Sequence, residues 1–145
     1  MSVLRFSAEH IKAAARIEAD TFSEPWSEES LKLLTKEEYP SFAICEGDEL
    51  AAYIGTARSL DELQILTVAT DLRARRRGYA REILAHLDGY AADHGISMIS
   101  LEVRESNVAA ISLYESCGYK TAGVRKNFYR FPTENALVMI KNFDN

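Results

Sequence analysis

The chain has 145 residues, of which 47% are hydrophobic and 27% are charged, and its formal net charge at pH 7 is −5. This length suits one domain, and the apolar content can form an ordinary hydrophobic core, so neither a disordered chain nor a metal-dependent mini-fold is needed to explain the composition. The acidic balance argues against nucleic-acid binding and is compatible with a cationic substrate. The longest apolar runs are strand-sized and no signal-peptide pattern opens the sequence, so we expect no membrane span and a cytoplasmic protein.

The first part of the chain is predicted to form a strand and two helices. Residues 3–6 have an apolar strand pattern. Ser7 can then cap a helix with apolar side chains at helical spacing, namely Ile11, Ala14, Ala15, Ile17 and Phe22. Ser27 is followed directly by two acidic residues, which is typical of a helix start, and this second helix should close before Pro40.

Three strands are predicted next, over residues 42–46, 50–58 and 62–70, and short turn segments separate them. Turns of that length favour an antiparallel meander. A helical pattern then runs from Gly78 to Gly95, where the glycine is a good left-handed stop.

The last part of the chain has strand patterns over residues 98–103, 119–124 and 136–143 and a short helix over 108–117. A strand, a helix and a further strand within about forty residues imply a right-handed parallel crossover. The full order is β-α-α-β-β-β-α-β-α-β-β. It predicts an α/β fold with a mixed, mostly antiparallel sheet and helices on both faces.

The cysteines and histidines show no pattern of a metal or disulfide site. Cys45 and Cys117 belong to no C-x-x-C pair and have no histidine at zinc-ligand spacing, so we interpret both as small core residues. We interpret His10, His86 and His94 as surface or helix-end residues.

Four arginines crowd the entrance of the third predicted helix: Arg73, Arg75, Arg76 and Arg77. A helix N-terminus is electropositive and disfavours arginine, so the cluster makes sense if an anion binds there. Gly78 and Ala80 leave room for that anion to approach the backbone. The preceding strand runs directly into this loop, and open α/β sheets bind ligands at such strand ends. The alternatives are a solvated basic loop and a contact to a nucleic-acid backbone.

The segment Arg75-x-x-Gly78-x-Ala80 resembles the pyrophosphate-binding signature of the GNAT acetyltransferases, R/Q-x-x-G-x-G/A. The resemblance implies acetyl-CoA as co-substrate and no metal, with the pantetheine arm on the preceding strand and the pyrophosphate on the loop. The cofactor-binding residues it implies are Val68, Ala69, Thr70, Arg75, Arg76, Arg77, Gly78, Tyr79, Ala80, Arg81 and Asn107. Thr70 departs from the family, where an apolar residue is more usual, but the contact there is through the backbone.

Residues 101–119 resemble, nearly position for position, the RimI-type segment L-E-V-R-x-S-N-x-x-A-x-x-L-Y-x-x-x-G-F/Y of the same superfamily. The likeness follows the element order of the whole chain and includes residues 22–27 and 125–129. It implies a single N-acetyltransferase domain over residues 1–145.

By this resemblance Glu102 is the general base, Tyr114 the general acid and Asn107 a contact to the pantetheine arm or the substrate. Acyl transfer from a thioester to an amine needs such a base and such an acid. Strand alternation also predicts that Glu102 is partly buried on a central strand. Pattern alone favours a polar strand residue for Glu102, a core aromatic for Tyr114 and a helix cap for Asn107, and the family match reverses the first two.

Trp26 and the pair Phe128-Tyr129 are ordinary core or surface aromatics by pattern, whereas the resemblance implies that they are walls of a substrate groove. The resemblance also names the acceptor, which is a protein N-terminus and specifically the N-terminal alanine of a small-subunit ribosomal protein. The N-terminal amine has a pKa near 7.7–8.0 against about 10.4 for lysine, so its neutral form is roughly 300-fold more available near pH 7.

Several alternatives to this acceptor stay open. The enzyme could act on another protein N-terminus, a lysine or a small-molecule amine, because loops determine the substrate of a fold. In a different class, the chain could be a non-catalytic acyl-CoA-binding module. We expect a monomer or a weak homodimer.

Overall fold

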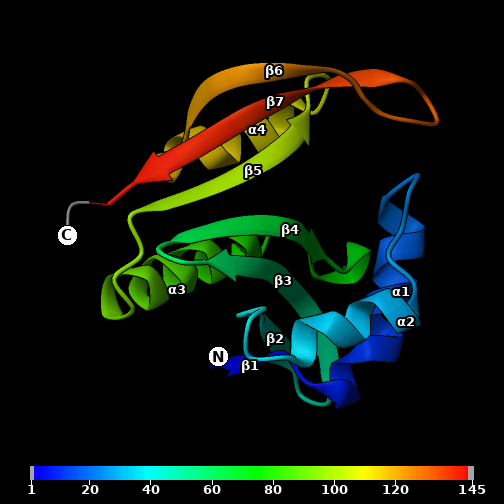
Figure 1. Ribbon diagram of the computed structural model, residues 1–145. Helices are drawn as coiled ribbons and strands as arrows, with labels where there is room; N and C mark the ends of the chain where they lie inside the picture. The colour runs from blue at the N-terminus through cyan, green and yellow to red at the C-terminus, as the bar shows by residue number, and fades with distance from the viewer. Residues whose placement is uncertain (1, 144–145) are drawn as a thin grey trace.

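The computed structural model describes residues 2–143, which form a mixed sheet with helices on both faces (Figure 1). The strands are β1 Val3–Arg5, β2 Phe42–Glu46, β3 Glu49–Ser59, β4 Glu62–Thr70, β5 Met98–Arg104, β6 Lys120–Tyr129 and β7 Glu134–Asn142. They lie in the order β1-β2-β3-β4-β5-β7-β6. In this part of the chain β4 and β5 run parallel, and the other neighbours are antiparallel. The predicted fold class is confirmed.

The helices cover the two faces of the sheet because strand residues alternate between them. Their bounds are α1 Ile11–Thr21, α2 Glu28–Leu31, α3 Tyr79–Asp93 and α4 Val108–Ser116. On β3, Ile54 packs into the core beneath α3 and α4, while Tyr53 packs into the core beneath α1 and α2. Each core is therefore closed by its own pair of helices.

The first two helices are shorter than predicted. Ser7 begins a 3₁₀ turn, Ala8–His10, before α1, and α1 ends at Thr21, so Phe22 lies outside it. The predicted second helix is four α-helical residues followed by the 3₁₀ turn Lys32–Thr35. Its buried leucines, Leu31 and Leu34, are three residues apart, and this spacing matches the period of a 3₁₀ helix.

One histidine is not at the surface. His10 lies at a helix end, as expected, but only 5% of it is exposed. Its ring lies 5.6 Å from that of Phe6, and its Nδ1 accepts a hydrogen bond from the Ser7 backbone N–H at 3.0 Å. Cys45 and Cys117 are free thiols at the margins of the two cores.

The sheet divides between β4 and β5. These strands pair only where residues 62–64 lie beside residues 98–100. Beyond that point β4 continues along β3 and β5 continues along β7 (Figure 1). Within residues 2–143, the facing edges of β4 after Gln64 and of β5 after Ser100 thus have no strand partner. Unpaired strand edges expose backbone donors and acceptors that another extended chain can bind.

Candidate active site

The loop after β4 is an open cradle at the start of α3. Gly78 precedes α3 in the left-handed conformation, at φ +80°, and no side chain caps the helix there. A Cβ on Gly78 would meet nothing within 4 Å. The first N–H groups of a helix attract anions, so the loop offers the room and the polarity that a pyrophosphate requires.

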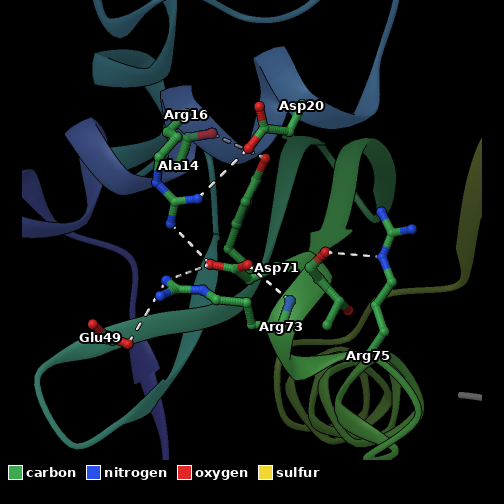
Figure 2. Close-up of polar contacts among 9 residues, drawn as sticks. Ala14, Arg16, Asp20, Glu49, Asp71, Arg73 and Arg75 are labelled. Atoms are coloured by element: carbon green, nitrogen blue, oxygen red, sulfur yellow. Dashed lines mark hydrogen bonds and ion pairs between the residues drawn. The ribbon is translucent and has the colours of Figure 1, made fainter.

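Asp71 anchors this loop to the sheet and to α1 (Figure 2). Its carboxylate accepts hydrogen bonds from the Arg16 guanidinium at 2.8 Å and from the Arg73 backbone N–H at 3.1 Å. These hydrogen bonds, the one from Arg16 above all, hold the pKa of Asp71 well below its usual range. Arg73 also reaches Glu49 at 3.8 Å, so its charge is directed at carboxylates and away from the loop.

The remaining arginines differ in what they contact. Arg77 pairs with Glu46 on β2, whereas Arg75 donates to the Thr70 carbonyl at 3.4 Å (Figure 2) and forms no ion pair with any residue that the structure describes. Arg76 adopts a positive φ of 67°, and no ion pair to it is found among the described residues. Arg75 and Arg76 are thus available to an anion at the loop, and Arg81 of α3, which donates to the Ser116 hydroxyl at 2.9 Å, likewise forms no ion pair with a described carboxylate.

Glu102 lies on β5 at the division of the sheet, and 12% of its side chain is exposed. Across the division, Gln64 of β4 donates a hydrogen bond from its Nε2 to Oε1 of Glu102 at 3.1 Å. Arg125 of β6 forms an ion pair with Oε2 at 3.9 Å. The predicted partly buried carboxylate is confirmed, and its two oxygens are held from opposite sides.

Tyr114 of α4 is a core aromatic and also has an available hydroxyl. It is 7% exposed, and its ring packs edge-to-face on Tyr119 at 5.9 Å between centroids. Burial, with a smaller effect of Tyr129, raises the pKa of Tyr114 far above its usual value. No hydrogen bond to its hydroxyl occurs within residues 2–143. The phenol therefore stays protonated and has its proton free to donate.

Asn107 caps α4, as its pattern indicated, because its Oδ1 accepts a hydrogen bond from the Ala110 backbone N–H at 3.2 Å. Its side chain is exposed at the start of the helix that contains Tyr114. A contact from Asn107 to a cofactor stays a prediction.

The aromatics expected in a groove lie on two segments that meet. Burial, and next the charge of Glu102, raise the pKa of Tyr129 to about 12. Phe128 packs edge-to-face on Tyr129 at 5.0 Å. Trp26 lines a shallow pocket of about 240 Å³ on the α1–α2 side. These segments touch where the Arg130 backbone N–H donates to a carboxylate oxygen of Glu24 at 2.8 Å.

A larger hollow, of about 720 Å³, lies elsewhere, around Phe42, Tyr90 and His94. None of the predicted site residues lines it. Among residues 2–143, no group of three acidic, histidine or cysteine side chains could hold a metal ion, and no helix is long and apolar enough to cross a membrane.

Gln64 and Arg125 were not identified from the sequence. Both contact Glu102 from other strands, and the register that brings Gln64 opposite Ser100 is a property of the folded sheet. A polar residue inside the largely apolar β4 pattern was the available signal.

Comparison with known proteins identifies the family. Residues 11–119 match the model of the acetyltransferase (GNAT) family. The [ribosomal protein bS18]-alanine N-acetyltransferase of Escherichia coli strain K12 is 37% identical over 133 residues, 89% of this chain and 88% of that protein.

Solved structures agree with this match. The crystal structure of the ribosomal-protein-S18-alanine N-acetyltransferase from Escherichia coli superposes with a TM-score of 0.93 at 32% identity, and covers 99% of this chain and 94% of that one. An acetyltransferase of Bacillus subtilis, solved in complex with CoA, has a TM-score of 0.78 over 99% of this chain and 97% of its own; at 12% identity it shows the fold alone. The chain belongs to the acetyltransferase (GNAT) family and is an acetyl-CoA-dependent N-acetyltransferase.

Proposed function

We propose that this enzyme acetylates the N-terminal amine of a small-subunit ribosomal protein whose first residue is alanine. The observation that carries the chemistry is Glu102, which Gln64 holds at the point where the pairing of β4 and β5 ends, so that the free edge of β4 leads from the anion loop to the carboxylate. The acceptor is supported by the substrate that names the relatives at 37% identity. With a ribosomal acceptor, we infer that the enzyme acts in the cytoplasm.

The loop and the β4 edge fit acetyl-CoA. In this proposal the N–H groups of residues 75–81 and the cations Arg75 and Arg76 bind the pyrophosphate. The unpaired backbone of residues 68–70 pairs with the amides of the pantetheine arm, because a free strand edge accepts an extended chain. Asn107 contacts the arm from the side of α4.

Acetyl-CoA supplies an activated acetyl group as a thioester, and the side chains of this chain move the protons. Glu102 accepts a proton from the attacking amine, directly or through one water, while Gln64 holds the carboxylate in place. Tyr114 donates its proton to the sulfur as the carbon–sulfur bond breaks and the carbon–nitrogen bond forms. A phenol with an ordinary pKa near 10 is already protonated at neutral pH, and burial raises the pKa of Tyr114 further, so its proton is present when the thiolate leaves.

The proposal of an N-terminal amine rests on the availability of its neutral form as well as on the relatives. Near pH 7 the neutral form of an N-terminal amine is roughly 300-fold more available than that of lysine, a difference of about 3.5 kcal/mol. A mechanism with a single carboxylate base suits the N-terminal amine, because its proton is easier to remove than that of lysine. A monomer or weak homodimer stays a prediction.

The proposal is tested by incubating the protein and acetyl-CoA with peptides beginning with alanine or other residues, lysine peptides with blocked N-termini, and polyamines. Mass spectrometry then locates the acetyl group. We expect it on the α-amine of the alanine peptides. Acetylation confined to lysine or to polyamines would reject the proposed acceptor, and no transfer to any amine would reject the proposed chemistry.

A further inference from the structure

Arg104 joins segments of the chain that are far apart in sequence. It follows Glu102 by two residues on β5, so the two side chains leave the same face of the sheet. The side chain is 22% exposed. Its terminal nitrogens donate four hydrogen bonds: to the Pro132 carbonyl at 3.0 Å, to Glu134 at 3.1 Å, to the Ser23 hydroxyl at 2.8 Å and to the Arg130 carbonyl at 2.8 Å.

Three of these contacts, one to Ser23 and two to the carbonyls of Arg130 and Pro132, hold the loop between α1 and α2, residues 22–27, against the turn between β6 and β7, residues 130–133. The two loops are also hydrogen-bonded to each other directly. The Ser23 hydroxyl donates to the Arg130 carbonyl at 3.1 Å, and the Arg130 N–H donates to Glu24 at 2.8 Å. Arg104 therefore completes a bridge between segments more than 100 positions apart.

The same guanidinium also packs on an aromatic ring of the site. Its central carbon lies 4.5 Å from the centroid of the Tyr129 ring. Glu102 and Arg104 both act electrostatically on Tyr129, the first raising its pKa and the second lowering it, and Tyr129 acts in turn on Tyr114. The Tyr129 ring thus packs on the arginine that bridges the two loops, and it interacts electrostatically with the proposed base and the proposed acid.

Glu134 extends the network to α4. One of its carboxylate oxygens accepts from Arg104, and the other accepts from the Ser106 backbone N–H at 2.7 Å. Ser106 directly precedes Asn107, which caps the helix containing Tyr114. One arginine thereby fixes the spacing between both loops, Tyr129 and the start of α4.

We propose that Arg104 is the positioning residue of the acceptor site: it holds the two loops and the Tyr129 ring as one preformed wall that receives the acceptor peptide beyond its first residue. The inference rests on the proposed function, because it assumes that the acceptor is a peptide. A lysine cannot replace this fork of donors, since its compact ammonium does not span four acceptors and stacks less well on a ring.

The alternative is that Arg104 only stabilises the fold, and Arg5 supplies the matched control. Arg5 also ties distant segments through its guanidinium, donating to the carbonyls of Leu34 at 3.0 Å, Ser41 at 2.7 Å and Lys36 at 2.6 Å. None of these residues belongs to the proposed site. Arg5→Lys therefore reports the stability cost of losing such a fork without changing the acceptor wall.

The test measures steady-state kinetics of the full-length wild type, Arg104→Lys and Arg5→Lys with acetyl-CoA and two acceptors, a short peptide beginning with alanine and alaninamide. We expect Arg104→Lys to raise the KM for the peptide roughly ten- to hundredfold, with the Kd for acetyl-CoA by calorimetry unchanged within about twofold. Alaninamide lacks the later residues, so its KM should change much less. Arg5→Lys should leave both KM values at the wild-type level.

A peptide KM that is unchanged in Arg104→Lys, or raised equally for alaninamide, would overturn the inference. A wild-type enzyme that does not acetylate the peptide would instead reject the proposed function. Glu24 gives a second test should Arg104→Lys fail to fold. Glu24→Gln keeps an oxygen that accepts from the Arg130 N–H, so it should retain the wild-type KM for the peptide, whereas Glu24→Ala should raise this KM. Equal peptide KM values for both Glu24 variants and the wild type would also count against the proposed wall.

Discussion

Replacing Tyr114 by phenylalanine separates catalysis from packing, because it removes one oxygen and leaves the ring. The ring packs on Tyr119 in the core, and Phe can keep that contact. The hydroxyl has no hydrogen-bond partner within residues 2–143. Removing a hydroxyl that lacks a partner costs little, so the free energy of unfolding should change by less than about 1 kcal/mol.

The effect on turnover should be far larger. Loss of general acid–base help typically lowers the rate about 10²–10⁴-fold, which corresponds to about 3–5 kcal/mol in the activation barrier. Affinity for acetyl-CoA should stay nearly unchanged, since the phenol proton is needed only as the thiolate leaves. The predicted signature is therefore a loss of kcat in a protein of normal stability and normal acetyl-CoA affinity.

Tyr119→Phe is the matched control. Its hydroxyl is buried and, like that of Tyr114, has no hydrogen-bond partner in the described part of the chain, and its ring is the other half of the same pair. Denaturant unfolding, calorimetry with acetyl-CoA and initial rates with an alanine peptide compare the two variants with the wild type. Wild-type turnover in Tyr114→Phe, or an equal loss in Tyr119→Phe, would refute the assignment of Tyr114 as the acid.

Two further predictions concern the cofactor loop. Gly78→Val and Gly95→Val both place a side chain at a positive φ with open space around the Cβ, so both should lose roughly 1–2 kcal/mol of stability. Only Gly78→Val should weaken acetyl-CoA binding, by tenfold or more in calorimetry; equal affinities would remove the loop from the site. Because the folded-state pKa of Asp71 is lowered, its charge stabilises the fold above about pH 4 and this contribution is lost as pH falls further. Asp71→Asn should therefore cost roughly 1–2 kcal/mol at pH 7 and less at pH 3 by denaturant unfolding, and a cost independent of pH would contradict the ion-pair account.

The elements with strong periodic patterns were predicted from the sequence nearly to the residue. The strands over 42–46 and 62–70 match β2 and β4, and α3 ends as expected just before Gly95, whose φ is +66°. These segments bury one face or both, so the spacing of their hydrophobic residues predicts their secondary structure.

The last hairpin was predicted too short because β6 is an edge strand. Arg125 and Tyr129 pair with β7, but the ladder between them is irregular, and residues 125–129 are largely exposed. Asn127 there adopts a positive φ of 53°. A strand without a buried face lacks the alternation of apolar and polar residues from which a strand is predicted.

Many residues of the candidate site could be identified from sequence motifs, but the contacts between them could not be predicted from those motifs. The loop, Glu102 and Tyr114 were identified in the sequence, whereas the division of the sheet that brings Gln64 to Glu102 depends on register. Likewise, the pairing of Arg77 with Glu46 follows from the position of β2 beside the loop. Contacts between residues distant in sequence are fixed only when the sheet closes.

The most direct test of the central claim compares Glu102→Gln with the wild type across pH, on an alanine peptide and on a lysine peptide with a blocked N-terminus. Glutamine keeps an oxygen that can accept from Gln64 but cannot take the amine proton. The account predicts a loss of about 10²–10⁴-fold at pH 7 on the alanine peptide. This loss should partly recover by about pH 9, where the N-terminal amine is already neutral, while any lysine activity should recover less because that amine stays protonated until roughly pH 10. A normal rate for Glu102→Gln on the alanine peptide near pH 7 would show that the carboxylate is structural and would contradict the account.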